Sequence, residues 1–250
     1  MNRWTRFALA TAGITMCLPT ADAYSVQPMT YHLTPTGSGS TTRLMVNNTH
    51  DTLLNVEVQP FAVTADVAGK RMFTPAPRDF LIFPPQASVA PDKSQLVQIR
   101  YVGSPDLQRG KVYVMRVHQT NTVTLTKEDP ATSSPTRLNV ALHFNTTAIV
   151  EPKGIESDLV VSKELAADAA GVLHGQLTNR GRGVADLSRF SWMIDRGGKI
   201  EQLPNEKVRY GDAVFIEPGA SRDFTFADTI RGPARLVLPK PGTNHGNAMQ

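Results

Sequence analysis

The stretch FLIFPPQASVAPDKSQLVQIRY, residues 80–101, carries the most specific structural signal in this sequence. It opens with an apolar run that ends at Pro84-Pro85 and closes with Leu96–Tyr101, where apolar and polar residues alternate. A period of two is typical of a β-strand with one buried face, and Pro91-Asp92 between the two runs is typical of a turn. The stretch predicts two strands joined by a turn.

The same alternation recurs on both sides of this stretch, with Gly, Pro, Asn and Asp between the alternating segments. It is found at residues 43–47, 54–58, 112–117 and 138–144. Short strands that recur with turn signals between them are typical of a β-sandwich or barrel. We therefore expect an all-β fold.

The second half of the chain has the same pattern of short predicted strands separated by turns. Segments 173–178, 190–194, 214–216 and 235–238 are predicted strands, with turns at 179–181 and 196–198. Two segments do not fit the pattern. The alanine-rich run 164–170 predicts at most a short helix or a loop, and the polar, proline-broken run 123–135 predicts a mobile loop between two strands.

A domain break is predicted at Glu151-Pro152-Lys153-Gly154, where proline cannot donate to a sheet and glycine permits a sharp turn. Both halves then have the size of an immunoglobulin-type sandwich, about 100 residues. We expect two immunoglobulin-like β-sandwich domains, over 24–152 and 153–240, and a flexible tail over 241–250.

Residues 1–23 are predicted to be a cleaved export signal. Arg3 and Arg6 supply the positive start, 7–18 is mostly apolar, and Ala21-Asp22-Ala23 has the small-x-small pattern of a cleavage site. Cleavage would leave an exported chain that begins at Tyr24 and has no membrane insertion, since no later stretch has about 18 uninterrupted apolar residues. In an alternative interpretation Cys17, the only cysteine, carries a lipid, although Ile14-Thr15-Met16 is a poor lipobox.

The residue inventory argues against several function classes. Without Arg3, Arg6 and Asp22 the chain has 24 basic and 21 acidic residues, spread along its length, which does not favour nucleic-acid binding. Neither a nucleophile elbow, a phosphate loop nor paired carboxylates can be recognised. We expect no catalytic site, no cofactor and no metal. The histidines lack metal-ligand spacing; they are His32, His50, His118, His143, His174 and His245.

Residues 80–101 resemble the first-domain signature of PapD-like periplasmic pilus chaperones of the chaperone-usher pathway. In these proteins a proline-marked strand leads through a turn into a strand that ends in an arginine, here Arg100. Val46-Asn47-Asn48 and the segment 137–152 resemble further parts of that domain. The resemblance implies a periplasmic chaperone that donates a β-strand to pilus subunits and delivers them to an outer-membrane usher.

The resemblance makes the segment around residues 138–144 the donated strand. The residues predicted to enter the groove of an incomplete subunit are Leu138, Val140, Leu142 and Phe144. Burial of each Leu or Val contributes roughly 1.5 to 3 kcal/mol, so the first three together would contribute about 5 to 8 kcal/mol before ordering costs. The alternative is that this apolar row faces the domain's own core, into which Phe144, Ala148 and Val150 continue it.

The sequence departs from the family at the anchor for the subunit's terminal carboxylate. Many members use an arginine in the first strand and a lysine near the end of the donor strand, where this chain has Met29 or Thr30 and Thr147. It is therefore more similar to the divergent archaic or alternate chaperones. Arg100 and Arg116, in neighbouring predicted strands, are the candidate replacements; equally, both can be ordinary exposed arginines.

Two other functions fit an exported all-β chain. A pilus subunit or tip component would carry a donor extension at its mature N-terminus, but 24–36 is short and contains Pro28. A carbohydrate-binding sandwich would need exposed aromatic platforms, and outside the export signal Trp192 is the only tryptophan.

Overall fold

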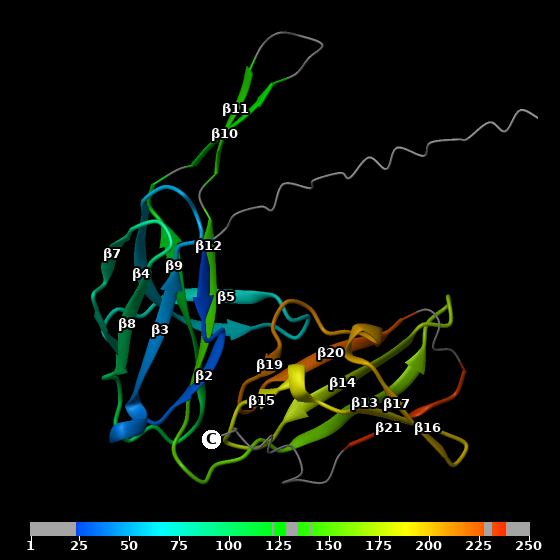
Figure 1. Cartoon of the computed structure of the whole chain (residues 1–250). Helices are drawn as coiled ribbons and strands as arrows, with labels where there is room; N and C mark the ends of the chain where they lie inside the picture. Colours follow the sequence, from blue (N-terminus) through cyan, green and yellow to red (C-terminus); the bar gives the residue numbers. More distant parts are fainter. Residues whose placement is uncertain (1–23, 122, 129–134, 141, 228–231, 239–250) are drawn as a thin grey trace, which may run out of the picture.

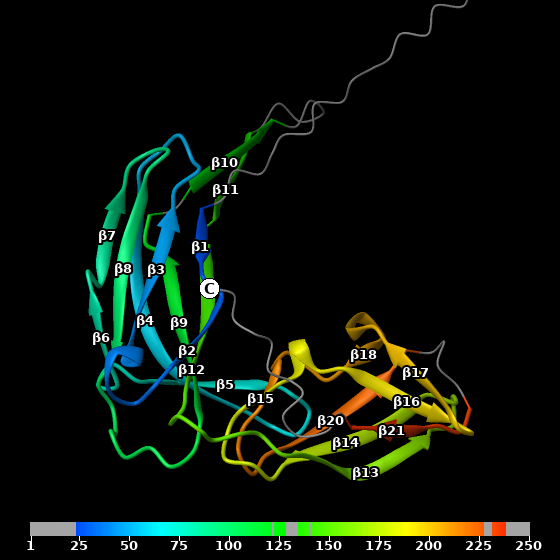
Figure 2. The same ribbon diagram turned by 60° about the horizontal axis from the view of Figure 1, so that its bottom comes forward.

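In the computed structural model the described residues are 24–121, 123–128, 135–140, 142–227 and 232–238, with only the backbone described for 123–128 and 135–140. The predicted export signal, Cys17 and the predicted tail lie outside them. The described part is built from two β-sandwiches, with a two-stranded hairpin projecting from the first (Figures 1 and 2).

The first sandwich consists of two sheets. One has the strand order β1-β3-β8-β6, and the other has the order β2-β12-β9-β4-β5, with β7 also paired to β4. The strands of this part of the chain are β1 Ser25–Gln27, β2 Thr30–Leu33, β3 Thr41–Asn47, β4 Leu54–Ala65, β5 Arg71–Pro75, β6 Phe80–Phe83, β7 Gln86–Val89, β8 Ser94–Tyr101, β9 Lys111–Gln119, β10 Val123–Glu128, β11 Pro135–Val140 and β12 His143–Val150.

The second sandwich has a sheet of order β13-β14-β20-β18, a sheet of order β17-β16-β21, and the pair β15-β19. Its strands are β13 Leu159–Ala167, β14 Leu173–Asn179, β15 Ala185–Asp186, β16 Trp192–Arg196, β17 Lys199–Leu203, β18 Val208–Arg209, β19 Phe215–Ile216, β20 Ser221–Phe226 and β21 Arg235–Val237. The described residues also include three short 3-10 turns: Ser38–Ser40 in the first sandwich, and Leu187–Arg189 and Asn205–Lys207 in the second.

Each sandwich encloses its own hydrophobic core. In the first, alternate residues of β8 and β3 such as Val97, Ile99 and Leu44 are buried. In the second, Trp192 is fully buried and stacks at 6.0 Å on Tyr210. The all-β, two-sandwich fold expected from the sequence is confirmed.

The period of two predicted the positions of the well-buried strands. The segments 43–47 and 96–101 lie in β3 and β8, which pair so that Met45 lies opposite Leu96. The expected turns at 179–181 and 196–198 each begin at the last residue of a strand, and Gly197 and Gly198 both have positive φ in the β16–β17 hairpin. Such φ values are what a two-residue hairpin turn requires.

Two expectations about weakly patterned segments were wrong. Residues 164–167 belong to the strand β13, not to a helix or loop, because pairing with β14 outweighs the helix propensity of alanine. Residues 123–128 form β10, which pairs with β11 from Val123 opposite Val140 to Glu128 opposite Pro135. The predicted loop 123–135 is therefore strand in its first part, and 129–134 lie outside the described residues.

Candidate functional site

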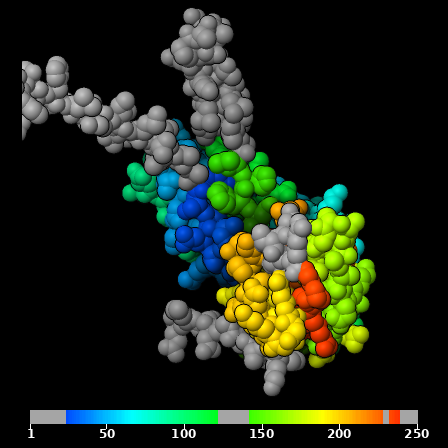
Figure 3. Space-filling view, turned by 90° about the vertical axis from the view of Figure 1, so that its right-hand side faces the viewer, coloured from blue at the N-terminus to red at the C-terminus, as the bar shows by residue number. Residues whose placement is uncertain are grey.

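Strand β12 is covered along only part of its outer edge. On one side it pairs with β9 over its whole length, from His143 opposite His118 to Val150 opposite Lys111. On the other side β2 pairs with it in parallel only from Thr147 to Val150. Figure 3 shows the N-terminal residues in blue beside the green residues that include β12. The stretch 143–146 has no β2 partner.

The chain that leads into β12 projects beyond the sandwich. Strand β11 precedes β12 and pairs only with β10 among the described strands, forming a ribbon that rises from the top of the first sandwich (Figures 1 and 2). The side chains of Leu138 and Val140, in β11, lie outside the described residues. Their positions face Leu125 and Val123 in the register of the ribbon.

The apolar row of the predicted donor strand changes its environment at residues 142 to 144. Leu142 is exposed, with 37% of its surface accessible. Phe144 is half-buried against the first core and makes an edge-to-face contact with Tyr24, with 4.7 Å between ring centroids. Phe144 thus belongs to the domain's own core, whereas Leu142 is the first position beyond it.

Tyr24 binds the base of this extension to the sandwich, and no sequence pattern indicated this role. Its hydroxyl lies 2.9 Å from the carbonyl oxygen of Val117 and 3.1 Å from that of Leu142. The Leu142 carbonyl also accepts a hydrogen bond of 3.0 Å from the Gln119 amide. Burial raises the pKa of the Tyr24 hydroxyl, so the group keeps the proton that it donates.

The two positions where the family carries its basic anchor lie together in the structure. Thr30 lies opposite Thr147 in the β2–β12 register, and the Thr147 amide donates to the Met29 carbonyl at 2.7 Å. The two anchor positions inferred from the family pattern are therefore neighbours across the β2–β12 pair. Neither Thr30, Met29 nor Thr147 has a cationic side chain, so the charge for an anion must come from another residue.

Arg116 lies on the same face, one step further along the sheet. Thr147 is opposite Val114 and Asn145 is opposite Arg116, so Arg116 is diagonal to Thr147 on the outward face. Diagonal neighbours of this kind lie about 7–8 Å apart, within reach of a long side chain. The site thus has a cation beside the expected anchor positions.

Two aromatic rings and an amide hold the Arg116 side chain. Its guanidinium lies 4.5 Å from the ring centroid of Phe61 and 5.5 Å from that of Phe73, and its Nε donates to Asn145 Oδ1 at 3.3 Å. Among the ion pairs between described residues, none involves Arg116. Its terminal N–H groups are therefore not committed to a carboxylate of this part of the chain.

Arg100 is placed elsewhere, and the expectation that the two arginines share neighbouring strands was wrong. Strand β8 belongs to the β1-β3-β8-β6 sheet and β9 to the other sheet, because the chain crosses between the two layers after Tyr101. Arg100 is exposed on the outer face of its sheet, opposite Leu81 and Thr41 on the neighbouring strands. It cannot join Arg116 in one anion site.

An apolar patch surrounds Arg100 on this outer face. Phe83 and Leu81 of β6 are 73% and 61% exposed, and Leu96 and Met45 of β8 and β3 are each 43% exposed. The four residues lie on neighbouring strands, with Leu96 opposite Met45. We call this group the outer patch. Exposed apolar patches often mark protein contact sites.

Glu151, which follows β12, links the two sandwiches through a partly buried carboxylate. Its Oε1 accepts a hydrogen bond of 2.5 Å from the Val184 amide, and Oε2 lies 3.9 Å from His32 Nδ1. Burial raises the pKa of this carboxyl, while the Val184 amide and His32 act in the opposite direction. At neutral pH, the ionised Glu151 carboxylate therefore lowers the stability of the folded protein.

We expect Glu151→Gln to raise the melting temperature slightly at pH 7–8 and to lose this advantage as the pH falls. A carboxyl whose folded pKa is raised opposes folding when ionised, and this opposition disappears when it is protonated. Glutamine keeps the oxygen that accepts from Val184 without the charge. Melting curves of both proteins between pH 4.5 and 8 test this, and a difference that grows on acidification would contradict it.

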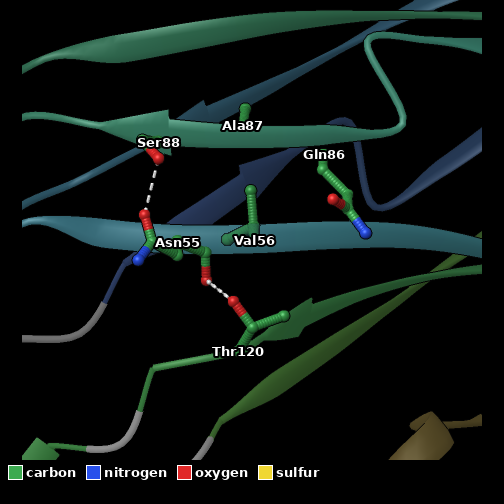
Figure 4. A pocket seen from close by; sticks show the side chains of 6 residues that line it. All are labelled: Asn55, Val56, Gln86, Ala87, Ser88 and Thr120. Atoms are coloured by element: carbon green, nitrogen blue, oxygen red, sulfur yellow. Dashed lines mark hydrogen bonds between the residues drawn. The ribbon is translucent and has the colours of Figure 1, made fainter.

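A shallow depression of about 430 Å³ lies over β4 and β7 and is shown in Figure 4. Three of its polar residues hydrogen-bond to one another: the Ser88 hydroxyl donates to Asn55 Oδ1 at 2.6 Å, and the Thr120 hydroxyl donates to the Asn55 carbonyl at 3.4 Å. All its lining residues are neutral: Asn55, Val56, Gln86, Ala87, Ser88 and Thr120. The depression adds no ionisable group to the site.

Within the described ranges, no group of three or more His, Cys, Asp or Glu residues is arranged to hold a metal ion. In the same part of the chain, no helix has the length and apolar character needed to cross a membrane.

No family model and no curated protein sequence matches the chain. Among solved structures, it is similar to the class 5 fimbriae chaperone CfaA, with a TM-score of 0.53 and 11% identity over 88% of this chain and 94% of that one. It is also similar to the E. coli chaperone DraB, with a TM-score of 0.51 and 17% identity over 86% and 89% of the two chains. A chain of the CsuC-CsuE chaperone-tip adhesion subunit complex of Acinetobacter baumannii gives 0.52 and 16%, over 84% and 88%. Across both sandwiches, the chain therefore has the fold of the chaperones of the chaperone-usher pathway, as residues 80–101 predicted.

Proposed function

We propose that this protein is a periplasmic chaperone that binds a pilus subunit by donating the strand formed by β11 and the start of β12. The observation that carries the proposal is the projection of this strand beyond the sandwich, with an apolar row that leaves the core between Phe144 and Leu142. Backbone pairing and alternate apolar side chains are the two requirements of recognition by strand addition. The donor residues are Leu138, Val140 and Leu142.

The comparisons support this function through their partners. One similar chain belongs to a solved structure from Acinetobacter baumannii. That structure is a complex of a chaperone with a tip adhesion subunit. Another, from Salmonella enterica, contains the SafA pilin with the SafB chaperone, at a TM-score of 0.52 and 12% identity. By the same proposal, residues 1–23 direct export to the periplasm, and 24–152 and 153–240 are the two domains.

Co-expression of the tagged protein with candidate pilus subunits tests this function. A subunit that lacks its last strand should be retained in the periplasm and purify with the chaperone in equal amounts. A matched sample that lacks the chaperone should lose the subunit to proteolysis. If no candidate subunit is retained or protected, the chaperone function is wrong.

For the subunit's terminal carboxylate we propose Arg116 as the anchor, in preference to Arg100. Arg116 lies on the face shared with Thr30 and Thr147, is held by Phe61 and Phe73, and has no described acidic partner. A guanidinium suits this role because it donates two parallel hydrogen bonds to a carboxylate. Asn145, which accepts from Nε, would hold the guanidinium plane.

For delivery, we propose that the outer patch contacts the outer-membrane usher. The patch lies on the opposite sheet from Arg116, so it stays exposed when a subunit occupies the β12 side. Phe83→Ser should reduce usher binding of the loaded chaperone about tenfold, since burial of a Phe is worth roughly 1.5–3 kcal/mol. Subunit retention should not change. A pull-down with the usher's periplasmic part measures this, and unchanged usher binding would contradict the assignment.

A further inference from the structure

The β4–β5 hairpin of the first sandwich reaches into the second. Its tip, residues 66–70, joins the end of β4 to the start of β5, and in Figures 1 and 2 this hairpin extends across to the second sandwich. The tip holds its own shape, because the Asp66 side chain accepts from the Lys70 amide at 2.8 Å and its carbonyl accepts from the Gly69 amide at 3.0 Å. It is thus a preformed element.

Backbone hydrogen bonds join this tip to the second sandwich. The Gly69 carbonyl accepts from the amides of Asp212 at 3.1 Å and Ala213 at 3.0 Å, and the Val67 carbonyl accepts from Asp223 at 2.8 Å. The Ala65 amide donates to Glu217 Oε2 at 3.2 Å. Because three of these bonds are between backbone groups, they require a fixed position of one sandwich relative to the other.

Gly69 fits this joint because it has no side chain. Its φ is +85°, and a Cβ atom there would lie 2.6 Å from an Arg222 guanidinium nitrogen and would collide with the Tyr210 carbonyl oxygen. A backbone oxygen cannot rotate away as a side chain can. Any larger residue must therefore push the tip out of the second sandwich.

Arg222 shapes the surface that receives the tip. It is 1% exposed, and its terminal nitrogens donate to the carbonyls of Ala213 at 3.0 Å, Tyr210 at 3.2 Å and Phe215 at 3.2 Å. Burial lowers the pKa of this guanidinium, while nearby Asp66, Glu217 and Asp223 oppose the shift. Asp66 belongs to the tip, so the first sandwich helps to stabilise the buried charge of the second.

The joint continues directly to the proposed anchor. Val63, Val112 and Val114 of the first sandwich are buried with Ala213 and Phe215 of the second in one hydrophobic cluster. Phe73, packed at the edge of this cluster, is one of the two rings that hold Arg116. A displacement at the tip would therefore reach the anchor through packed side chains.

We propose that the tip 66–70 and Arg222 form a joint that positions the second sandwich against the first, and that this positioning is required for subunit capture although the joint does not touch the subunit. The inference rests on the proposed function. Gly69 and Arg222 are positioning residues for binding. Their replacement should change the arrangement of the sandwiches and the affinity together.

The test compares Gly69→Ala with Gly37→Ala in the full chain. Gly37 also has a positive φ, +78°, but nothing lies within 4 Å of an added Cβ, so Gly37→Ala controls for a side chain at positive φ without the collision. Small-angle scattering of Gly69→Ala should show a larger radius of gyration than the wild type and Gly37→Ala. If about a tenth of the molecules keep the competent arrangement, the apparent affinity for the subunit falls about tenfold.

A second variant and a folding control keep the result interpretable. Glu217→Ala removes one hydrogen bond across the joint. It should change the radius of gyration and the affinity for the subunit in the same direction as Gly69→Ala, but by less. Circular dichroism should show that both variants keep their β-structure. Wild-type scattering by Gly69→Ala, or altered scattering with wild-type capture, overturns the inference. If the wild type itself captures no subunit, the proposed function fails instead.

Discussion

Replacement of Val140 by Asp is expected to abolish retention of the subunit. The position lies in β11, within the apolar row Leu138, Val140 and Leu142 that we propose for the subunit groove. The change removes roughly 1.5–3 kcal/mol of apolar burial and adds the cost of an unpaired buried carboxylate, several kcal/mol more. Together these correspond to a loss of about a thousandfold or more in affinity. The yield of subunit that purifies with the chaperone measures the effect.

Asn139→Asp is the matched control, because it introduces the same carboxylate at the position of β11 directly before Val140. Successive residues of a strand face opposite sides, so residue 139 should not enter the groove. Retention should stay close to that of the wild type. A complex that survives Val140→Asp, or that is lost equally in both variants, would contradict the assignment of the apolar row.

Arg116→Ala is expected to reduce subunit retention at least about tenfold, since a charge-assisted hydrogen bond is worth about 1.5–3 kcal/mol. The melting temperature should change little, because the lost contacts with Phe61 and Phe73 are worth only about 0.5–1 kcal/mol each at such a site. Retention assays and melting curves of the purified chaperone measure the two effects separately.

Arg100→Ala removes the same charge from the other sheet and should leave retention unchanged. If Arg100→Ala reduces retention and Arg116→Ala does not, the anchor has been placed on the wrong face. Unaltered retention by both variants would rule out an arginine anchor altogether.

The sequence predicted the parts of the fold that depend on local alternation. Strands β3 and β8 were found because Leu44, Val97 and Ile99 are fully buried and their neighbours are exposed. Strand β13 was missed because it is a half-exposed edge strand whose residues 164–167 are exposed or only partly buried. Its strand conformation follows from pairing with β14, and no local pattern records that pairing.

The candidate site was predictable only in part, because long-range contacts build it. Counting along the family pattern identified Thr30 and Thr147, which lie opposite each other in the structure. Arg116 could be named as a cation, but its position next to Thr147 depends on the pairing of β9 with β12. The joint was not predicted at all, because its contacts are between distant residues. The hydrogen bond from the Ala65 amide to Glu217, for example, links residues 152 positions apart.

Amide hydrogen exchange over residues 135–146, with and without a bound subunit, tests the donation of this strand most directly. In the free protein, β11 pairs only with β10 among the described strands, and 143–146 have no partner on the β2 side. The amides of this segment that face the open edge, away from β9 and β10, should exchange fast in the free protein and slow markedly in the complex, because the subunit supplies their backbone partners. A stable complex in which the exchange of 135–146 is unchanged would contradict strand donation.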